Sequence, residues 1–425
     1  MLDIQFVREN SETVKTGMKQ KGEEDLSVVD RVLEVDQTWR DLVVQVDELR
    51  AESNTKAKQI GVLKGEGKHE EADRIIRETS KAKEEVKELE KKMQSAKKER
   101  DELLLKIPNL PHESVPVGSG EEDNKVVHSW GEPDRSDWRK PHWELAERTG
   151  WIDFDRGVKV AGAGFPFYRG DVARLQRTLI NFFIDEAVGQ GYEELQSPFF
   201  VNEDSARGTG QIPDKEDMMY EIARDGFFPI PTAEVPVTNF HRDEILPGQE
   251  LPLRYVAYTP CWRREAGSHG KDVRGLNRLH QFDKVELVKI VRPEDSYEEL
   301  ESLRRQAEVL LEKLGLPYRT LLMCTGDMGF TQSKKYDLEV WSPGQKRWLE
   351  VSSCSNFTDY QARRLMLRYR NDDGKPEIAH TLNGSGLALP RVMAAILEAY
   401  QTEEGKVEVP EVLQERMGKK LIAES

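Results

Sequence analysis

The sequence predicts an α+β protein with two parts: an amino-terminal antiparallel two-helix coiled-coil arm, and a carboxy-terminal domain in which helices flank a mainly antiparallel sheet. Three features of the sequence carry this prediction. Apolar residues repeat with a 3,4 spacing over residues 32–103, a stretch rich in proline, glycine and acid covers 111–136, and short strand-like and helix-like patterns follow. We therefore expect an amino-terminal domain at 1–110, a linker at 111–136 and a main domain at 137–425.

The heptad pattern predicts two long helices that pack along a narrow seam. A period of 3.5 residues places an apolar stripe on one side of each helix, so two helices joined by a glycine-rich turn can bury their stripes against each other. We expect this hairpin over about residues 30–105, with helices of roughly 35 residues and a length of about 50 Å. The seam positions are Val32, Val35, Trp39, Leu42, Val46, Leu49, Ser53, Lys56, Ile60 and Leu63, then Ala72, Ile75, Thr79, Ala82, Val86, Leu89, Met93, Ala96, Arg100 and Leu103.

Charge is distributed unevenly along the chain. The formal net charge is −15 at pH 7, which argues against a general nucleic-acid or membrane-surface binder. Residues 28–107 contain 18 basic and 19 acidic side chains, so the acidity lies outside the arm. The second helix has enough cations for a basic stripe, although a solvated face with i,i+4 ion pairs also explains them. These cations are Lys81, Lys83, Lys87, Lys91, Lys92, Lys97, Lys98 and Arg100.

Composition narrows the class of protein further. The chain has 425 residues and only three cysteines, Cys261, Cys324 and Cys354, without a C-x-x-C pair. Neither a disulfide framework nor a zinc site is expected from so few thiols. The amino terminus has charges where a secretory signal would be apolar, and no stretch approaches the ~20 apolar residues that span a bilayer. We expect a cytoplasmic protein without membrane association.

The main domain shows both helical and strand periodicities. Helical spacing of apolar residues covers 172–188, 297–314 and 390–400. Alternation predicts strands at 253–262, 281–291, 338–341 and 347–351. Strands outnumber helical crossovers, which is typical of an antiparallel sheet flanked by helices.

The densest group of reactive side chains lies in a strand–loop–strand unit at 255–291. Strand side chains alternate, so Arg263 and Glu265 should share one face while Arg264 points away. Arginine can bind a phosphate, a carboxylate can accept from an adenine amine and a phenyl ring can stack on a base, so a nucleotide site is predicted. Cross-strand ion pairing is the alternative explanation. The loop carries Lys271, Arg274 and Arg278, and the returning strand carries His280, Phe282, Lys284 and Glu286.

The same unit resembles motif 2 of the class II aminoacyl-tRNA synthetases, and in detail CWRREAGS and RGLNRLHQFDKVEL resemble the seryl-tRNA synthetase family. Further stretches agree in order: FPIPTAEVPVTN, LEVSSCSNFTDYQARR, and HTLNGSGLALPR, which resembles motif 3. Residues 172–198 resemble motif 1, which forms the dimer interface in the family. Pro390 stands where many relatives have glycine, and proline fits the first turn of a helix.

The resemblance implies an ATP site. Arg263 would contact the α-phosphate, Glu265 the adenine amine, and Phe282 the face of the ring. Arg391 would hold the γ-phosphate, and Glu350 with Ser353 would hold Mg²⁺. Catalytic roles are expected for Arg263 and Arg391. The complete expected ATP set is Arg263, Arg264, Glu265, Leu279, His280, Gln281, Phe282, Glu350, Val351, Ser352, Ser353 and Arg391.

The resemblance also implies a serine site. Carboxylates would bind the ammonium and hydroxyl groups, and neutral donors would complete the pocket. Taken alone, Thr232 and Ser385 would more often be capping or turn residues. The expected serine set is Thr232, Ala233, Glu234, Glu286, Asn383 and Ser385.

The family resemblance implies a serine–tRNA ligase that charges tRNA(Ser), and tRNA(Sec) where a host has one. A homodimer would bind the tRNA across its subunits, with the arm on the RNA and the cationic motif 2 loop near the acceptor end. The GTGQ loop at 208–211 resembles a family loop whose role the residues do not reveal.

Features of the sequence also argue against three other classes of protein. Threonyl and prolyl synthetases normally add a further domain, for which the residues after Tyr400 leave no room. Carrier-protein aminoacylases lack the long arm. An inactive scaffold would be expected to have lost Arg263, Glu265, Glu286 or Arg391. The zinc-dependent form of the family is not expected either.

Overall fold

The computed structural model describes residues 1–213, 217–265 and 274–423. Two compact units are present. The arm unit comprises Leu2–Lys19 and Glu23–Pro108, and the sheet unit comprises Met1, Gln20–Gly22 and Asn109–Ser425. The boundary near residue 108 lies close to the predicted end of the first domain.

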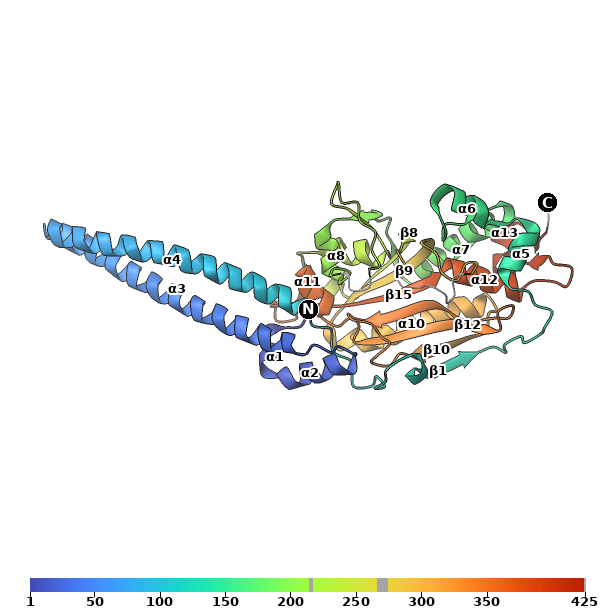
Figure 1. Cartoon of the computed structure of the whole chain (residues 1–425), viewed down its shortest axis with the longest axis horizontal. Helices are drawn as coiled ribbons and strands as arrows, with labels where there is room; N and C mark the ends of the chain where they lie inside the picture. The colour runs from blue at the N-terminus through green and yellow to red at the C-terminus, as the bar shows by residue number, and fades with distance from the viewer. Residues whose placement is uncertain (214–216, 266–273, 424–425) are drawn as a thin grey trace. The chain divides into compact units, whose positions relative to one another are not determined.

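The arm unit consists of four helices. Short helices α1 (Ile4–Glu9) and α2 (Ser11–Gln20) precede α3 (Ser27–Gly65) and α4 (His69–Leu104). Helices α3 and α4 run antiparallel and lie side by side along their length (Figure 1). All twenty predicted seam positions are buried or partly buried, so the coiled-coil prediction is confirmed.

A charged cluster closes the base of this hairpin. Arg100 of α4 lies 3.1 Å from the Asp36 carboxylate of α3, and its guanidinium lies 4.6 Å from the centre of the Trp39 ring. Arg8 of α1 contacts the other oxygen of Asp36 at 3.2 Å. Asp36 and Arg100 are both buried, and a buried charge keeps its place only when it is paired in this way.

The lysines of α4 fall into two groups, those in ion pairs along the helix and those without an ion pair. Lys91, Lys97 and Lys98 form ion pairs three or four residues along the helix. Lys81 and Lys87 are exposed and form no ion pair with any residue that the structure describes. The helix therefore combines paired and uncompensated cations.

The sheet unit is built on an eight-stranded sheet in the order β1-β10-β11-β12-β15-β9-β8-β4. All neighbours are antiparallel except β4 and β8, as predicted for a mainly antiparallel sheet. The strands are β1 (Lys125–Trp130), β4 (Glu193–Glu194), β8 (Leu253–Trp262), β9 (Gln281–Val291), β10 (Tyr318–Leu322), β11 (Lys334–Ser342), β12 (Arg347–Asn356) and β15 (His380–Ala388).

Three helices cover one face of this sheet: α7 (Gly170–Gly189), α10 (Ser296–Lys313) and α12 (Leu389–Ala399). Their bounds lie close to the predicted 172–188, 297–314 and 390–400. Apolar residues of all three helices share one core with Val285, Leu287 and Leu382 of the sheet. Side chains alternate along a strand, so the side chains of Lys284 and Glu286 face the side of the sheet away from the helices. That side is therefore available for a site.

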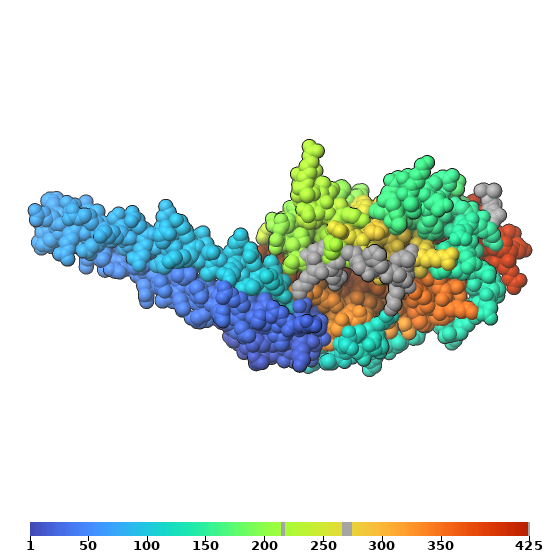
Figure 2. Space-filling view, viewed as in Figure 1, coloured from blue at the N-terminus to red at the C-terminus, as the bar shows by residue number. Residues whose placement is uncertain are grey.

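The predicted linker at 111–136 differs from what the structure shows. Residues 125–130 form β1, which pairs with β10 at the edge of the sheet. All six of its residues are exposed, and the teal atoms of this segment lie on the outer surface in Figure 2. Val126 and Val127 favour a strand, but the flanking proline, glycine and acid dominate the composition of the stretch.

Smaller elements complete the sheet unit. They are η1 (Glu121–Asp123), α5 (His142–Thr149), β2 (Ile152–Asp153), α6 (Phe154–Ala161), β3 (Phe167–Tyr168), β5 (Phe200–Val201), α8 (Glu203–Thr209), β6 (Phe228–Pro229), α9 (Glu234–Thr238), η2 (Asn239–His241), β7 (Ile245–Pro247), η3 (Gly248–Glu250), η4 (Pro293–Asp295), α11 (Tyr360–Leu365), β13 (Arg368–Arg370), β14 (Pro376–Ile378), β16 (Val407–Glu408), α13 (Glu411–Met417) and β17 (Leu421–Ile422). No helix in the described part of the chain is long and apolar enough to cross a bilayer.

Candidate active site

A cleft of about 500 Å³ lies on the side of the sheet opposite the three helices. Its floor consists of side chains from β9, β12 and β15, and its rim includes the end of β8, the start of α12 and part of the GTGQ loop. Most of the predicted site residues meet here. Those that line it are Thr232, Glu234, Arg263, Glu265, Leu279, Phe282, Glu350, Val351, Ser352, Ser353, Asn383, Ser385 and Arg391.

Arg263 lies at one wall of the cleft, directly after β8. Its Nε donates to the Pro231 carbonyl at 3.3 Å, and its guanidinium lies 5.1 Å from the centre of the Phe282 ring. Phe282 pairs with Cys261 in the β8–β9 register, so the ladder places it next to the strand end that carries Arg263. A cation and an aromatic face are thereby fixed together at the cleft.

The predicted alternation after β8 is confirmed by the exposure of these side chains to the cleft. Arg263 and Glu265 line the cleft, and Glu265 forms an ion pair with Arg278 at 3.1 Å. Arg264 does not line it and instead lies 3.3 Å from the Asp217 carboxylate.

Arg391 enters the opposite wall in the first turn of α12, next to Pro390. Its Nη1 donates to the Glu350 carbonyl at 2.8 Å, and its Nε donates to the Asn277 carbonyl at 2.9 Å. Partial burial in the cleft acts to raise the pKa of Glu350, whose side chain remains 46% exposed, but the charges of Arg391 and Lys335 outweigh this effect and hold its pKa below the ordinary range. Glu350 is thus an anion between cations.

A hydrogen-bonded group of polar side chains occupies the deep end of the cleft. Thr232 Oγ1 donates to Glu286 Oε2 at 2.9 Å. Asn383 Nδ2 donates to Glu286 Oε1 at 3.1 Å and to Glu234 Oε2 at 2.8 Å. Gln361 Nε2 donates to the remaining oxygen of Glu234 at 2.6 Å. All five side chains are buried, so two carboxylates lie close together in a small space at the bottom of the cleft.

The two carboxylates perturb each other. Burial raises the pKa of Glu234 to about 7, with a further contribution from the negative charge of Glu286. Lys284, which forms an ion pair with Glu286, partly offsets this effect on Glu234. A carboxyl group that titrates near neutrality and faces a cleft is typical of a functional site.

Five predicted residues do not line the cleft, although they lie beside it: Glu286 of the buried hydrogen-bonded group, Ala233, Arg264, His280 and Gln281. Ala233 is buried in an apolar cluster. The His280 ring stacks on Phe165 with ring centres 5.6 Å apart, and Gln281 accepts from Trp262 Nε1 at 3.2 Å. Any contact of Arg264, His280 or Gln281 with a ligand would involve the backbone or a rearrangement.

The loops of the cleft carry the remaining predicted residues. Gly210 and Gln211 of the GTGQ loop line it. Thr209 lies behind them, where its carbonyl accepts from Gln361 Nε2 at 3.2 Å. Arg274 lies over the Trp143 ring at 5.1 Å, and Lys271 lies outside the described residues.

Several cleft residues were missed by the sequence analysis. Gln361, Asn277 and Lys335 touch or line the site, but none belongs to a charged or apolar pattern. Gln361 stands within the stretch LEVSSCSNFTDYQARR that carried the resemblance. Its place at the start of α11, after a buried turn, is the signal that could have identified it as a site residue.

The fold and the cleft define a class II aminoacyl-tRNA synthetase. The family model of the tRNA synthetase class II core domain (G, H, P, S and T) matches residues 220–400. The seryl-tRNA synthetase N-terminal domain model matches residues 1–111.

Relatives narrow the class to one family. The serine–tRNA ligase of Salinibacter ruber is 57% identical over 415 residues, 97% of each chain. That of Bacillus subtilis is 51% identical over 421 residues, 98% of each chain. The crystal structure of seryl-tRNA synthetase from Pyrococcus horikoshii complexed with ATP matches with a TM-score of 0.94 at 38% identity, covering all of both chains. The cytoplasmic serine–tRNA ligase from Naegleria fowleri, in complex with AMP, matches with a TM-score of 0.88 at 32% identity, covering 100% of this chain and 99% of that one. The chain belongs to the seryl-tRNA synthetase family.

Proposed function

We propose that the cleft carries out both steps of serine–tRNA ligation: formation of seryl-adenylate from L-serine and ATP, and transfer of the seryl group to the 3′ end of tRNA(Ser). The observation that carries the proposal is the juxtaposition of two arginines with a buried carboxylate–amide cluster in one cleft. Arginines suit a triphosphate, and the cluster suits a small, zwitterionic amino acid that has a hydroxyl group.

In the first step, a serine carboxylate oxygen attacks the α-phosphorus of ATP. The new P–O bond forms as the bond between the α-phosphorus and the bridging oxygen breaks, and pyrophosphate leaves. Arg263 stabilises the charge that builds on the α-phosphate, and Arg391 holds the γ-phosphate at the other wall. Catalysis then rests on position and electrostatic stabilisation. Phe282 supports the adenine ring, and Glu265 accepts from its amine.

Serine selectivity is assigned to the deep end of the cleft. Glu234 and Glu286 bind the ammonium and hydroxyl groups, and Thr232, Asn383 and Ser385 complete the pocket. Alanine would leave buried polar groups without partners, and a site built to bind a hydroxyl rejects the analogue without it by roughly 10⁴-fold or more.

The residues present fit a Mg²⁺ ion that is held mainly by ATP. Glu350 and Ser353 line the cleft with the hard oxygens that Mg²⁺ prefers. Asp337, which pairs with Ser353 across β11 and β12, has a buried oxygen with no hydrogen-bond partner among the described residues. Among all the residues that the structure describes, no group of three or more His, Cys, Asp or Glu side chains could hold a metal ion. Phosphate and water would therefore supply the other ligands. Bound there, Mg²⁺ would neutralise charge on the phosphates.

For the second step, the terminal ribose hydroxyl of the tRNA attacks the carbonyl carbon of seryl-adenylate, an ester forms and AMP leaves. The arm binds the long variable arm and elbow of the tRNA, consistent with the uncompensated lysines of α4. We assign the binding of the tRNA to a homodimer, in which α7 and β4 form the interface and the tRNA lies across both subunits. The second substrate would be tRNA(Sec), where a host has one. Three buried free cysteines favour the cytoplasm.

A stable sulfamoyl analogue of seryl-adenylate tests the assignment of the cleft. We expect it to bind the protein tightly in isothermal titration calorimetry and to raise the melting temperature. The matched alanyl analogue, which lacks only the hydroxyl, should bind far more weakly. Equal affinity for the two analogues would contradict the assignment of the deep end to serine.

A further inference from the structure

A buried carboxylate–imidazole pair lies next to the ATP wall of the cleft, outside the residues assigned above. Glu398 of α12 and His142 at the start of α5 are both 0% exposed, and α5 packs beside α12 (Figure 1). Glu398 Oε1 accepts from His142 Nδ1 at 2.8 Å and from the His142 backbone N–H at 3.0 Å. The pair therefore joins two distant parts of the sequence.

The carboxylate of Glu398 is fully hydrogen-bonded. Besides His142, its oxygens accept from the Ser342 hydroxyl, from the Gly344 N–H at 3.2 Å and from Gln345 Nε2 at 3.0 Å. Burial acts to raise the pKa of Glu398, but the hydrogen bonds from His142 and Ser342 outweigh burial and lower the pKa. Glu398 is thus an ionised hub on which the turn between β11 and β12 also rests.

His142 connects Glu398 to the end of the motif 2 loop. The Leu276 N–H donates to His142 Nε2 at 2.8 Å, so Nε2 is an acceptor and the proton resides on Nδ1, facing Glu398. Gly275 has a φ of +68°, and a Cβ there would lie 2.2 Å from His142 Nε2. The loop end therefore lies directly against the imidazole, and a side chain at 275 would displace it.

A second branch leads from Glu398 to Arg391. Gln345, which donates to Glu398, accepts from Asn277 Nδ2 at 2.8 Å. The Asn277 carbonyl in turn accepts from Arg391 Nε at 2.9 Å. Both branches end on residues 276 and 277, and one of them continues to the guanidinium that faces the cleft.

We propose that Glu398 and His142 are positioning residues for the ATP site: they hold residues 276–277 in place and, through the Asn277 carbonyl, orient Arg391. The proposal rests on the proposed function, since it assigns Arg391 to the triphosphate. Neither residue touches a substrate. Displacing a substrate-binding group by about 1 Å can cost on the order of 100-fold in rate, so a precise anchor for Arg391 has a direct consequence for ATP.

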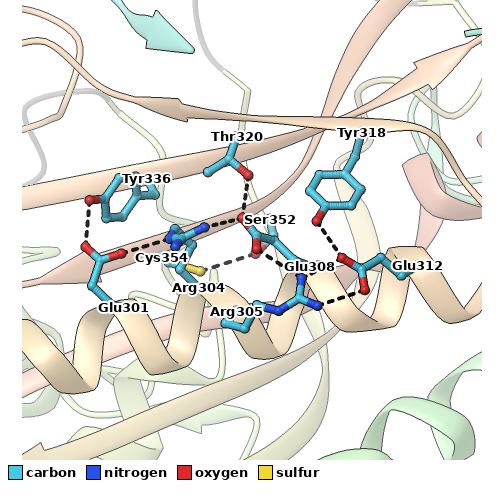
Figure 3. Close-up of polar contacts among 10 residues, drawn as sticks. All are labelled: Glu301, Arg304, Arg305, Glu308, Glu312, Tyr318, Thr320, Tyr336, Ser352 and Cys354. Carbon is cyan, nitrogen blue, oxygen red and sulfur yellow. Dashed lines mark hydrogen bonds and ion pairs between the residues drawn. The ribbon is translucent and has the colours of Figure 1, made fainter. Parts of the chain in front are cut away.

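A matched control exists in α10, on the helix-covered face of the sheet and not on the face that carries the cleft. Glu308 of α10 is also buried, at 1% exposed, and it contacts Arg304, Arg305 and Thr320 (Figure 3). None of these four residues is among the described residues that line the cleft. Glu308→Gln therefore removes a buried charge of the same kind without reaching the ATP site.

The test measures the KM of ATP and of serine by pyrophosphate exchange, together with melting temperature, for four variants of the network and for the Glu308→Gln control. Glu398→Gln and His142→Leu should raise the KM of ATP roughly tenfold or more and leave that of serine unchanged. His142→Gln, which keeps an acceptor for Leu276, should recover much of the loss. Gln345→Met, at a partly exposed turn, should raise the KM of ATP with little loss of melting temperature.

Hydrogen–deuterium exchange gives a second readout, independent of catalysis. We expect the peptide that contains Leu276 to exchange faster in His142→Leu than in the wild type, and to remain as in the wild type in Glu308→Gln. Glu308→Gln should lower the melting temperature and leave both KM values unchanged.

The inference is overturned if Glu398→Gln and Gln345→Met lower the melting temperature but leave the KM of ATP unchanged. It is also overturned if Glu308→Gln raises the KM of ATP as much as Glu398→Gln does. These results differ from a failure of the proposed function, in which the wild-type protein itself would show no serine-dependent exchange.

Discussion

Serine binding should weaken as the pH falls from 8 to 6, because Glu234 takes up a proton in that interval. Glu234 is 6% exposed, and burial followed by the charge of Glu286 raises its pKa to about 7. An ionised Glu234 attracts the ammonium group of serine, and a neutral one does not. For a pKa of about 7, the ionised fraction falls from about 0.9 at pH 8 to about 0.1 at pH 6, so the KM of serine should rise about tenfold.

The same shift affects the stability of the free enzyme with a sign opposite to that of a salt-bridged acid. The folded-state pKa of about 7 lies above the ordinary value of 4.5, so between these values the folded protein holds a proton that the unfolded chain releases. The stabilising contribution is therefore complete below pH 4.5 and is lost as the pH rises through 7. Its full size is about 3 kcal/mol.

The assay is pyrophosphate exchange at saturating ATP between pH 6 and pH 8, with Glu234→Gln as the matched variant. The glutamine cannot ionise, so its KM for serine should be high and independent of pH across this range. The melting temperature of the Glu234→Gln protein, relative to that of the wild type, should rise as the pH increases from 5 to 8. A wild-type KM that stays constant, or a variant with the same pH slope, would refute the reasoning.

Three further predictions test other parts of the account. Arg263→Met should lower the rate of exchange by roughly 100- to 1,000-fold at an unchanged melting temperature; a loss below about tenfold would contradict its role at the α-phosphate. Gln361→Leu should raise the KM of serine and move the pH midpoint above that of the wild type, because Gln361 Nε2 donates to Glu234 at 2.6 Å and lowers its pKa; a midpoint that moves down or stays would show that this bond does not control Glu234. Deletion of residues 35–100 should leave adenylate formation intact and abolish charging of tRNA(Ser), measured by aminoacylation, and charging that survives would show that the arm is not needed.

Local patterns in the sequence predict the arm and the central strands well. The seam from Val32 to Leu103 is a periodic signal over many helical turns. The burial of each seam position depends only on the packing of the two arm helices against each other. Strands β8 and β9 match the predicted 253–262 and 281–291 because apolar alternation continues to their ends. Strands β11 and β12 extend beyond 338–341 and 347–351, since polar residues such as Asp337 and Ser353, which pair across the two strands, hide the apolar pattern.

The site required information that no local pattern contains. Glu286 and Asn383 are brought together by the neighbouring strands β9 and β15. Thr232 joins them from the segment between β6 and α9, and the family resemblance supplied this grouping. Gln361 and His142 were missed because each acts through hydrogen bonds to residues that are distant in the sequence. Spacing along the chain cannot reveal such partners, which depend on tertiary packing.

Pyrophosphate exchange across a panel of amino acids tests the central claim most directly. Purified protein with ATP and Mg²⁺ should exchange labelled pyrophosphate into ATP with serine, and exchange with alanine or threonine should be weaker by orders of magnitude. Exchange with threonine or alanine but not with serine would contradict the account.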